Sequence, residues 1–248
     1  MSLGRLYSFH TIKCMRPNFV VPVSINKLSS NVPCGRNFSS SEKLVDVSIN
    51  EKTGISTVTM QRLPVNSLNL ELLRELCTVF DALEKDKSRG MILTSGHSPA
   101  GGCLLALSCE YRVMVGPKYT IGLNETQLGI VAPKWFEYTM SNVIPKRQTE
   151  LALTFGRMFS SEEAHKLGLV DELAVDKADA IAKAETFLSG MSKIPAAARN
   201  FSKLTCRQEP LEWMKRNKEK DLQQFLGLVS APAVQRGLEL YMQSLKKK

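Results

Sequence analysis

The order in which apolar patterns follow one another constrains the fold of this chain more than any other feature. Apolar and polar residues alternate from residue 44 to residue 60 around the turn sequence at 51–54, which predicts a β-hairpin. Apolar residues then recur at helical spacing over 70–85 behind Asn69, a natural helix N-cap, and residues 90–94 are typical of a short buried strand. A hairpin, a helix and a strand in this order predict an α/β fold.

The rest of the chain changes from mixed strands and helices to helices alone. Short helices are expected at 101–109, 133–142, 145–155 and 160–168, and short strands at 111–115 and 119–121. Four further helices are expected at 178–188, 195–204, 211–229 and 232–245. Because no internal repeat or linker interrupts this order, we predict one domain over residues 42–248.

Residues 1–41 differ in composition from the rest of the chain. They contain five Lys or Arg residues, no Asp or Glu, and several serines, which is typical of a mitochondrial transit peptide. We therefore expect a disordered segment that directs the protein to the mitochondrial matrix, the alternative being a basic tail without targeting function. The formal charge of +9 for the whole chain falls to +4 without these five residues, which argues against a nucleic-acid-binding surface.

Several classes of function lack their sequence signatures. The six cysteines include no C-x-x-C pair and there are only three histidines, so we expect no metal site and no disulfide framework. The motifs G-x-S-x-G, G-x-G-x-x-G and H-E-x-x-H are absent, which argues against hydrolase, nucleotide-binding and metalloprotease readings. No apolar run approaches the roughly 20 residues of a membrane span.

The first feature that can support chemistry is a glycine pair, Gly101 and Gly102, at the start of a predicted helix. Unpaired backbone N–H groups and the positive end of the helix dipole converge at such a position, which can hold a negatively charged oxygen. The alternative is a tight turn whose glycines serve only close packing.

The second feature is Glu125, the only charged residue from Tyr119 through Pro133. A carboxylate among apolar residues is partly desolvated, which raises its pKa and makes it a better proton acceptor near neutral pH. The alternatives are an exposed loop glutamate and a hydrogen-bonded structural acid.

Together these features resemble the crotonase (enoyl-CoA hydratase/isomerase) superfamily, and within it the mitochondrial enoyl-CoA isomerases. The motif N-E-T-Q-L-G at 124–129 follows the glycine pair, a helix and two strands. The resemblance extends to L-P-V-N-S-L at 63–68 and to G-L-V-D at 168–171, and it covers residues 44–248. It implies a crotonase-like ββα spiral core followed by C-terminal helices.

The resemblance also implies a reaction, in which the double bond of 3-enoyl-CoA moves to give trans-2-enoyl-CoA during β-oxidation of unsaturated fatty acids. It implies that Glu125 carries a proton from C2 to C4, and that the N–H of Gly101, beside Gly102, is one of two donors to the thioester oxygen. Hydratases of the family have a second glutamate where this chain has Leu104, which favours isomerisation over addition of water.

The remaining implications concern binding and assembly. Contacts with CoA or the acyl chain are implied for Val65, Asn66, Leu104 and Asn124. Acyl-CoA is then the substrate, with no separate cofactor and no metal. The family analogy further implies a homotrimer that assembles through the helices from about residue 175 onward.

One segment of the family pattern is missing. Family members continue after the strand at 90–94 with a loop of the type F-S-A-G-L-D, a helical stretch and another strand, whereas here Gly96 follows Ser95 at once. About 50 residues are absent by this comparison, far more than a trimmed loop. The first oxyanion donor, much of the acyl pocket and one core strand then have no counterpart. The alternative function is therefore a catalytically impaired isoform or a silent oligomer subunit.

Overall fold

The computed structural model describes residues 43–62, 66–86 and 88–246. These residues form two compact units. The N-terminal unit contains the chain up to Ser95 together with residues 192–201, and the C-terminal unit contains Gly96–Met191 and the chain from Ser202 onward. The predicted transit peptide and Val65 lie outside the described residues.

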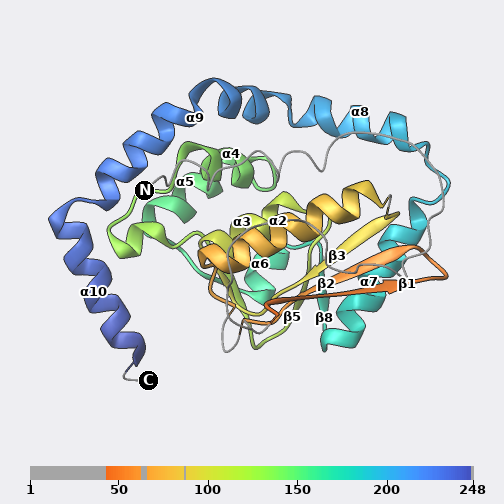
Figure 1. The fold of residues 1–248 in the computed structure, drawn as a ribbon. Coiled ribbons are helices and arrows are strands. Elements are labelled where there is room, and N and C mark those ends of the chain that lie inside the picture. Colours follow the sequence, from red (N-terminus) through yellow and green to blue (C-terminus); the bar gives the residue numbers. More distant parts are fainter. Residues whose placement is uncertain (1–42, 63–65, 87, 247–248) are drawn as a thin grey trace, which may run out of the picture. The chain divides into compact units, whose positions relative to one another are not determined.

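A three-stranded sheet and one long helix make up most of the N-terminal unit (Figure 1). β1 (Val45–Asn50) pairs antiparallel with β2 (Ile55–Met60), and β3 (Gly90–Thr94) pairs parallel with β2. α2 (Leu70–Lys85) connects β2 to β3 and contacts β1. The predicted hairpin, helix and strand are confirmed.

Apolar packing and one carboxylate hold α2 on the sheet. The buried apolar residues of this unit are Val45, Ile55, Val58, Met60, Leu72, Leu76, Phe80, Leu83 and Ile92. The side chain of Asn69 accepts the N–H of Leu72 at 3.0 Å, which confirms the predicted N-cap. The carboxylate of Glu75 accepts the N–H groups of Leu44 and Val45 at 3.2 and 3.0 Å, and so ties the helix to the first strand.

β3 stands at the edge of this sheet. The strand order is β1-β2-β3, and among the described strands β3 pairs with β2 alone. Immediately after β3 the chain leaves the N-terminal unit, at Ser95. The first segment of this unit therefore ends where the sequence comparison places the missing segment, and one edge of β3 is unpaired by any described strand.

The C-terminal unit begins with short strands and helices in alternation. Its elements up to the last strand are β4 (Ser98–Pro99), α3 (Gly101–Ser108), β5 (Val113–Val115), β6 (Thr120–Gly122), the 3₁₀ helix η2 (Glu125–Leu128), α4 (Lys134–Ser141), α5 (Lys146–Phe155), β7 (Phe159–Ser160), α6 (Ser161–Leu167) and β8 (Glu172–Ala174). The strands form two small sheets, one with the order β4-β6-β7 and one of β5 and β8. The strands β4, β7 and β8 are too short to have been predicted from periodicity.

One core joins these elements. Its buried residues are Cys103, Leu107, Met114, Ile121, Leu123, Met140, Ile144, Ala152, Phe159, Ala164, Leu169 and Val170. A capping box begins α6, since the side chain of Ser160 accepts the N–H of Glu163 and the Glu163 side chain accepts the N–H of Ser160. Arg112 and Asp171 form a partly buried ion pair of 2.9 Å. It joins the segment just before β5 to the segment between α6 and β8.

Four helices complete the chain: α7 (Lys177–Gly190), α8 (Ala196–Cys206), α9 (Gln208–Val229) and α10 (Pro232–Lys246). The predicted α/β class followed by C-terminal helices is confirmed. Among the described residues of these helices, Leu222 is the one buried apolar side chain, whereas Phe201 and Leu240 are 65% and 67% exposed. Within the C-terminal unit, α9 contacts α4, and α10 contacts both α9 and η2. None of the described helices is both long and apolar enough to cross a membrane.

Candidate active site

The glycine pair lies where sequence analysis placed it, at the start of α3. Ala100 precedes it with φ 49° and ψ −118°, a conformation that glycine adopts more readily than alanine. The N–H groups of the first turn have no acceptor within the helix, and no acidic residue stands in that turn to compete for them. The N–H groups of Gly101 and Gly102 can therefore serve an outside oxygen.

Gly122, at the end of β6, connects this turn to Glu125. Its carbonyl accepts the N–H of Ala100 at 2.8 Å, which ties the end of β6 to the residue before α3. A Cβ on Gly122 would collide with the carbonyl oxygen of Arg157, so the close approach of the chains requires glycine. Since Glu125 follows only three residues later, the two candidate features belong to one local structure.

Glu125 is the first residue of η2 and is 7% exposed. Burial raises the pKa of its carboxyl above the usual value, and a hydrogen bond from its own backbone N–H offsets part of that effect. Its Oε2 is buried with no hydrogen-bond partner among the described residues. The predicted desolvation of this acid is confirmed, and an unpaired buried oxygen is free to receive a proton.

Cys103 on α3 lies close enough to Glu125 for the carboxylate to affect its thiol. Cys103 is fully buried, and burial together with the negative charge of Glu125 raises the pKa of its thiol far above the usual value. The thiol therefore stays protonated and serves as packing between α3 and the strand before Glu125. Among the described residues, no group of His, Cys, Asp or Glu is arranged to hold a metal ion.

The other predicted contact residues are distributed over both units. Asn124 is 9% exposed beside Glu125, and its Oδ1 has no partner among the described residues. Leu104, the residue that the family resemblance relates to the second glutamate of hydratases, is buried in the first turn of α3. Asn66 belongs to the N-terminal unit and has a φ of 52°, and its Oδ1 has no hydrogen-bond partner within the described part of the chain.

Sequence reasoning did not identify the residues that hold the Glu125 turn in place. The hydroxyl of Thr126 donates to the carbonyl of Leu153 at the end of α5, and Gly156 lies against the same turn. A glycine directly after the helical pattern at 145–155 was the only available signal, and it indicated no more than a helix C-cap.

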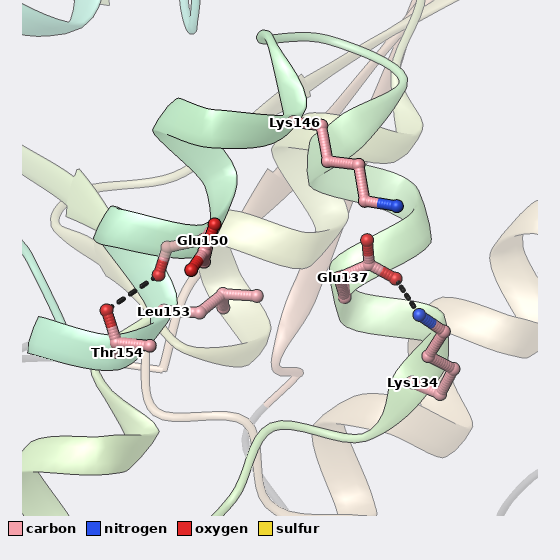
Figure 2. Close-up of a pocket in the computed structure, with 6 residues that line it drawn as sticks. All are labelled: Lys134, Glu137, Lys146, Glu150, Leu153 and Thr154. Carbon is pink, nitrogen blue, oxygen red and sulfur yellow. Dashed lines mark hydrogen bonds and ion pairs between the residues drawn. The ribbon is translucent and has the colours of Figure 1, made fainter.

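A pocket of about 290 Å³ lies between α4 and α5, away from these residues (Figure 2). It is lined by Lys134, Glu137, Lys146, Glu150, Leu153 and Thr154. Lys134 and Glu137 form an ion pair of 2.5 Å across its rim, and the hydroxyl of Thr154 donates to the carbonyl of Glu150. None of the predicted site residues lines it, so this pocket is separate from the candidate site.

The arrangement around Glu125 fits one kind of chemistry. Backbone N–H groups at a helix start stabilise an oxygen that becomes negative during a reaction, and a carboxyl with a raised pKa can take up and return a proton. Together they suit proton transfer next to a carbonyl group.

Comparisons with known proteins agree with this chemistry. A family model described as "Enoyl-CoA hydratase/isomerase" matches residues 94–248. The mitochondrial enoyl-CoA delta isomerase 1 of Mus musculus is 36% identical over 257 residues, which cover 83% of this chain and 89% of the mouse protein. The Homo sapiens protein of the same name is 32% identical over 263 residues, covering 86% of each chain.

The three-dimensional comparison gives a related result. The crystal structure of human mitochondrial delta3-delta2-enoyl-CoA isomerase superposes with a TM-score of 0.79 at 32% identity, covering 83% of this chain and 99% of that chain. An enoyl-CoA hydratase from Mycobacterium marinum, 18% identical, has a TM-score of 0.67 and supports the fold alone.

The alignment lengths support the missing segment. The mouse alignment has 257 positions, whereas 83% of the 248 residues of this chain is about 206, so about 50 positions of it face no residue of this chain. This number agrees with the predicted deletion. The family match also begins at residue 94, beside the Ser95–Gly96 junction at which the chain passes from one unit to the other.

Proposed function

The chain belongs to the enoyl-CoA hydratase/isomerase family, and from this premise we propose that it moves the double bond of 3-enoyl-CoA to give trans-2-enoyl-CoA. The observation that carries the proposal is Glu125, a buried carboxylate with a raised pKa in the same local structure as the Gly101 turn. The mitochondrial isomerases of mouse and human cover most of the chain and support the same reaction in the β-oxidation of unsaturated fatty acids.

In this reaction Glu125 acts at two carbons of the acyl chain, C2 and C4. Its carboxylate removes a proton from C2, and the electron pair of that C–H bond moves toward the thioester carbonyl to give a dienolate. The N–H of Gly101 donates to the enolate oxygen and stabilises its negative charge. The protonated Glu125 then returns the proton to C4, and the double bond settles between C2 and C3.

One carboxylate suffices because the proton returns to the carbon skeleton of the same substrate. Addition of water needs a second acid or base, and at that position Leu104 is buried and apolar. The proposed contacts with CoA or the acyl chain are Val65, Asn66, Leu104 and Asn124. The reaction requires no cofactor and no metal.

The proposed location of this chain is the mitochondrial matrix, with residues 1–41 as transit peptide. The similar mouse and human enzymes, which are named mitochondrial, support this location. A homotrimer is the proposed assembly.

The direct test is an isomerase assay of the purified chain with 3-hexenoyl-CoA. Formation of trans-2-hexenoyl-CoA is expected, and Glu125→Gln should lower the rate by about 10²–10⁴, the usual contribution of a positioned acid–base group. A wild-type rate no higher than that of the Glu125→Gln protein contradicts the proposal.

The second candidate is a silent subunit that assembles without catalysis. It is favoured by the roughly 50 alignment positions without a counterpart and by the exposed apolar side chains of Phe201, Leu228 and Leu240. Sedimentation analysis combined with acyl-CoA binding separates the two. A stable oligomer that melts cooperatively yet binds no acyl-CoA supports the silent subunit.

A further inference from the structure

The turn that carries Glu125 rests on the C-terminal end of α5. The last carbonyls of a helix have no partner within the helix, and η2 supplies donors to two of them. Thr126 Oγ1 donates to the carbonyl of Leu153 at 2.6 Å, and Gln127 Nε2 donates to the carbonyl of Phe155 at 3.4 Å. Both donors directly follow Glu125 in the chain, so the place of the carboxylate depends on where α5 ends.

α5 ends at Gly156, which has a φ of +58°. A Cβ at this residue would lie 2.7 Å from Cγ of Gln127 and 3.0 Å from its backbone nitrogen, closer than side chains normally pack. It would also lie 3.4 Å from the carbonyl oxygen of Asn124. The missing side chain therefore lets the end of the helix lie directly against the turn on both sides of Glu125.

The helix itself is anchored in the core. Thr149 and Ala152 on α5 are each 1% exposed, and Gly156 makes the usual cap hydrogen bonds to the carbonyls of Ala152 and Leu153. An element that is held this firmly can transmit its position to the residues that rest on its end.

We propose that Gly156 and Thr126 are positioning residues for Glu125: the glycine admits η2 against the end of α5, and the threonine fastens it there. The proposal rests on the proposed function, because it assigns these residues a part in keeping the proton-carrying carboxylate in place. Neither residue takes part in the chemistry itself.

The chain contains a matched control for Gly156. Gly168 ends α6 in the same left-handed conformation, with φ +81° and cap hydrogen bonds to the carbonyls of Ala164 and His165. Apart from its chain neighbours and its own helix, no described residue has an atom within 4 Å of the place that the Cβ of Gly168 would occupy. Gly168→Ala therefore imposes the backbone penalty of a left-handed alanine without a collision.

The experiment compares Gly156→Ala, Thr126→Val and Gly168→Ala in the full chain. Turnover of 3-hexenoyl-CoA and the ¹³C NMR titration of the Glu125 carboxyl are measured, with Glu125→Gln identifying the resonance. We expect Gly156→Ala and Thr126→Val to lower kcat about tenfold or more with KM within about twofold, since small misplacements of a catalytic group are costly. In both, the pKa of Glu125 should move back toward its ordinary value, while Gly168→Ala changes neither quantity.

The possible outcomes separate this proposal from the proposed function. Equal kcat and equal Glu125 titration in Gly156→Ala and Gly168→Ala overturn the positioning role. Should Gly156→Ala not fold, Thr126→Val decides, because it only exchanges an exposed hydroxyl for a methyl group. If the wild-type chain shows no turnover, the proposed function fails, and the titration of Glu125 in the variants still decides whether Gly156 and Thr126 position it.

Discussion

At the scale of single residues, Glu125 shows the conflict between stability and chemistry most clearly. Its carboxyl is 7% exposed and one oxygen lacks a partner among the described residues, so burial raises its pKa. A carboxyl whose pKa is higher in the folded than in the unfolded chain binds its proton more tightly in the folded state. Folding is therefore favoured at low pH, and this contribution is lost as the pH rises through the folded-state pKa.

Glu125→Gln should consequently melt at a higher temperature than the wild-type chain near pH 7.5, because the neutral amide avoids burial of a charge. The difference should shrink as the pH is lowered toward about 4.3, the ordinary glutamate value, since both side chains are then uncharged in the folded state. Thermal denaturation from pH 4 to pH 8 measures it. A gap in Tm that stays constant over this range shows that Glu125 does not titrate as its burial implies.

At the scale of elements, the site is built from the ends of short segments. The glycine turn at Ala100–Gly102 lies where β4 meets α3, Glu125 begins a single 3₁₀ turn, and the end of α5 lies against that turn. Ala100 has a backbone conformation that disfavours a side chain. Its N–H donates to the carbonyl of Gly122, and its own carbonyl accepts the N–H of Leu104 at 3.0 Å. Two hydrogen bonds on neighbouring elements thus maintain a strained residue.

The same substitution should therefore have opposite effects in two elements. Ala100→Gly relieves the strain of a positive φ, and we expect it to raise Tm by about 2–4 °C, which corresponds to about 1 kcal/mol in a chain of this size. Ala182→Gly, at an exposed position within α7, should lower Tm by a similar amount because glycine weakens a helix interior. Scanning calorimetry compares the two, and a decrease in Tm for both variants contradicts strain at Ala100.

The elements also show which parts of the fold could be predicted from the sequence alone. Long periodic segments such as α2 and α9, the Asn69 cap and the capping box at Ser160 were predictable because local chemistry determines them. The three-residue strands β5 and β6 were predicted from their apolar residues, but the two-residue strands β4 and β7 were not, since they exist only through pairing with β6. The burial of Glu125 followed from its apolar neighbours, whereas the contact of Gly156 with η2 joins segments about 30 residues apart and leaves no local pattern.

At the scale of the whole molecule, the junction at Ser95 and Gly96 is the dominant feature. It separates two compact units, it follows a strand with one edge unpaired by any described strand, and it lies beside the first residue of the family match. β3 contains no charged residue and no proline, the devices that usually protect an exposed strand edge from pairing with other molecules. The chain is accordingly expected to be less stable and more prone to association than its relatives.

Insertion of the corresponding segment of the mouse isomerase, about 50 residues, between Ser95 and Gly96 tests this expectation. The restored chain should have a higher Tm and less aggregation, because the edge of β3 regains a neighbour. Isomerase turnover should rise by about 10²–10³, the usual value of one oxyanion donor. Static light scattering, calorimetry and the 3-hexenoyl-CoA assay measure the three effects, and a restored chain that behaves like the original places the defect elsewhere.

The close packing of Gly122 against the carbonyl of Arg157 affects how such a chain can diverge over generations. A mutation that gives Gly122 a side chain disrupts the core whether or not the protein still turns over substrate, so selection for folding alone preserves it. Glu125 has no such protection, because replacing a buried acid is expected to favour folding. A lineage that has given up the reaction would thus keep its glycines and lose its glutamate, and retention of Glu125 across related species would be the better genetic record of continuing activity.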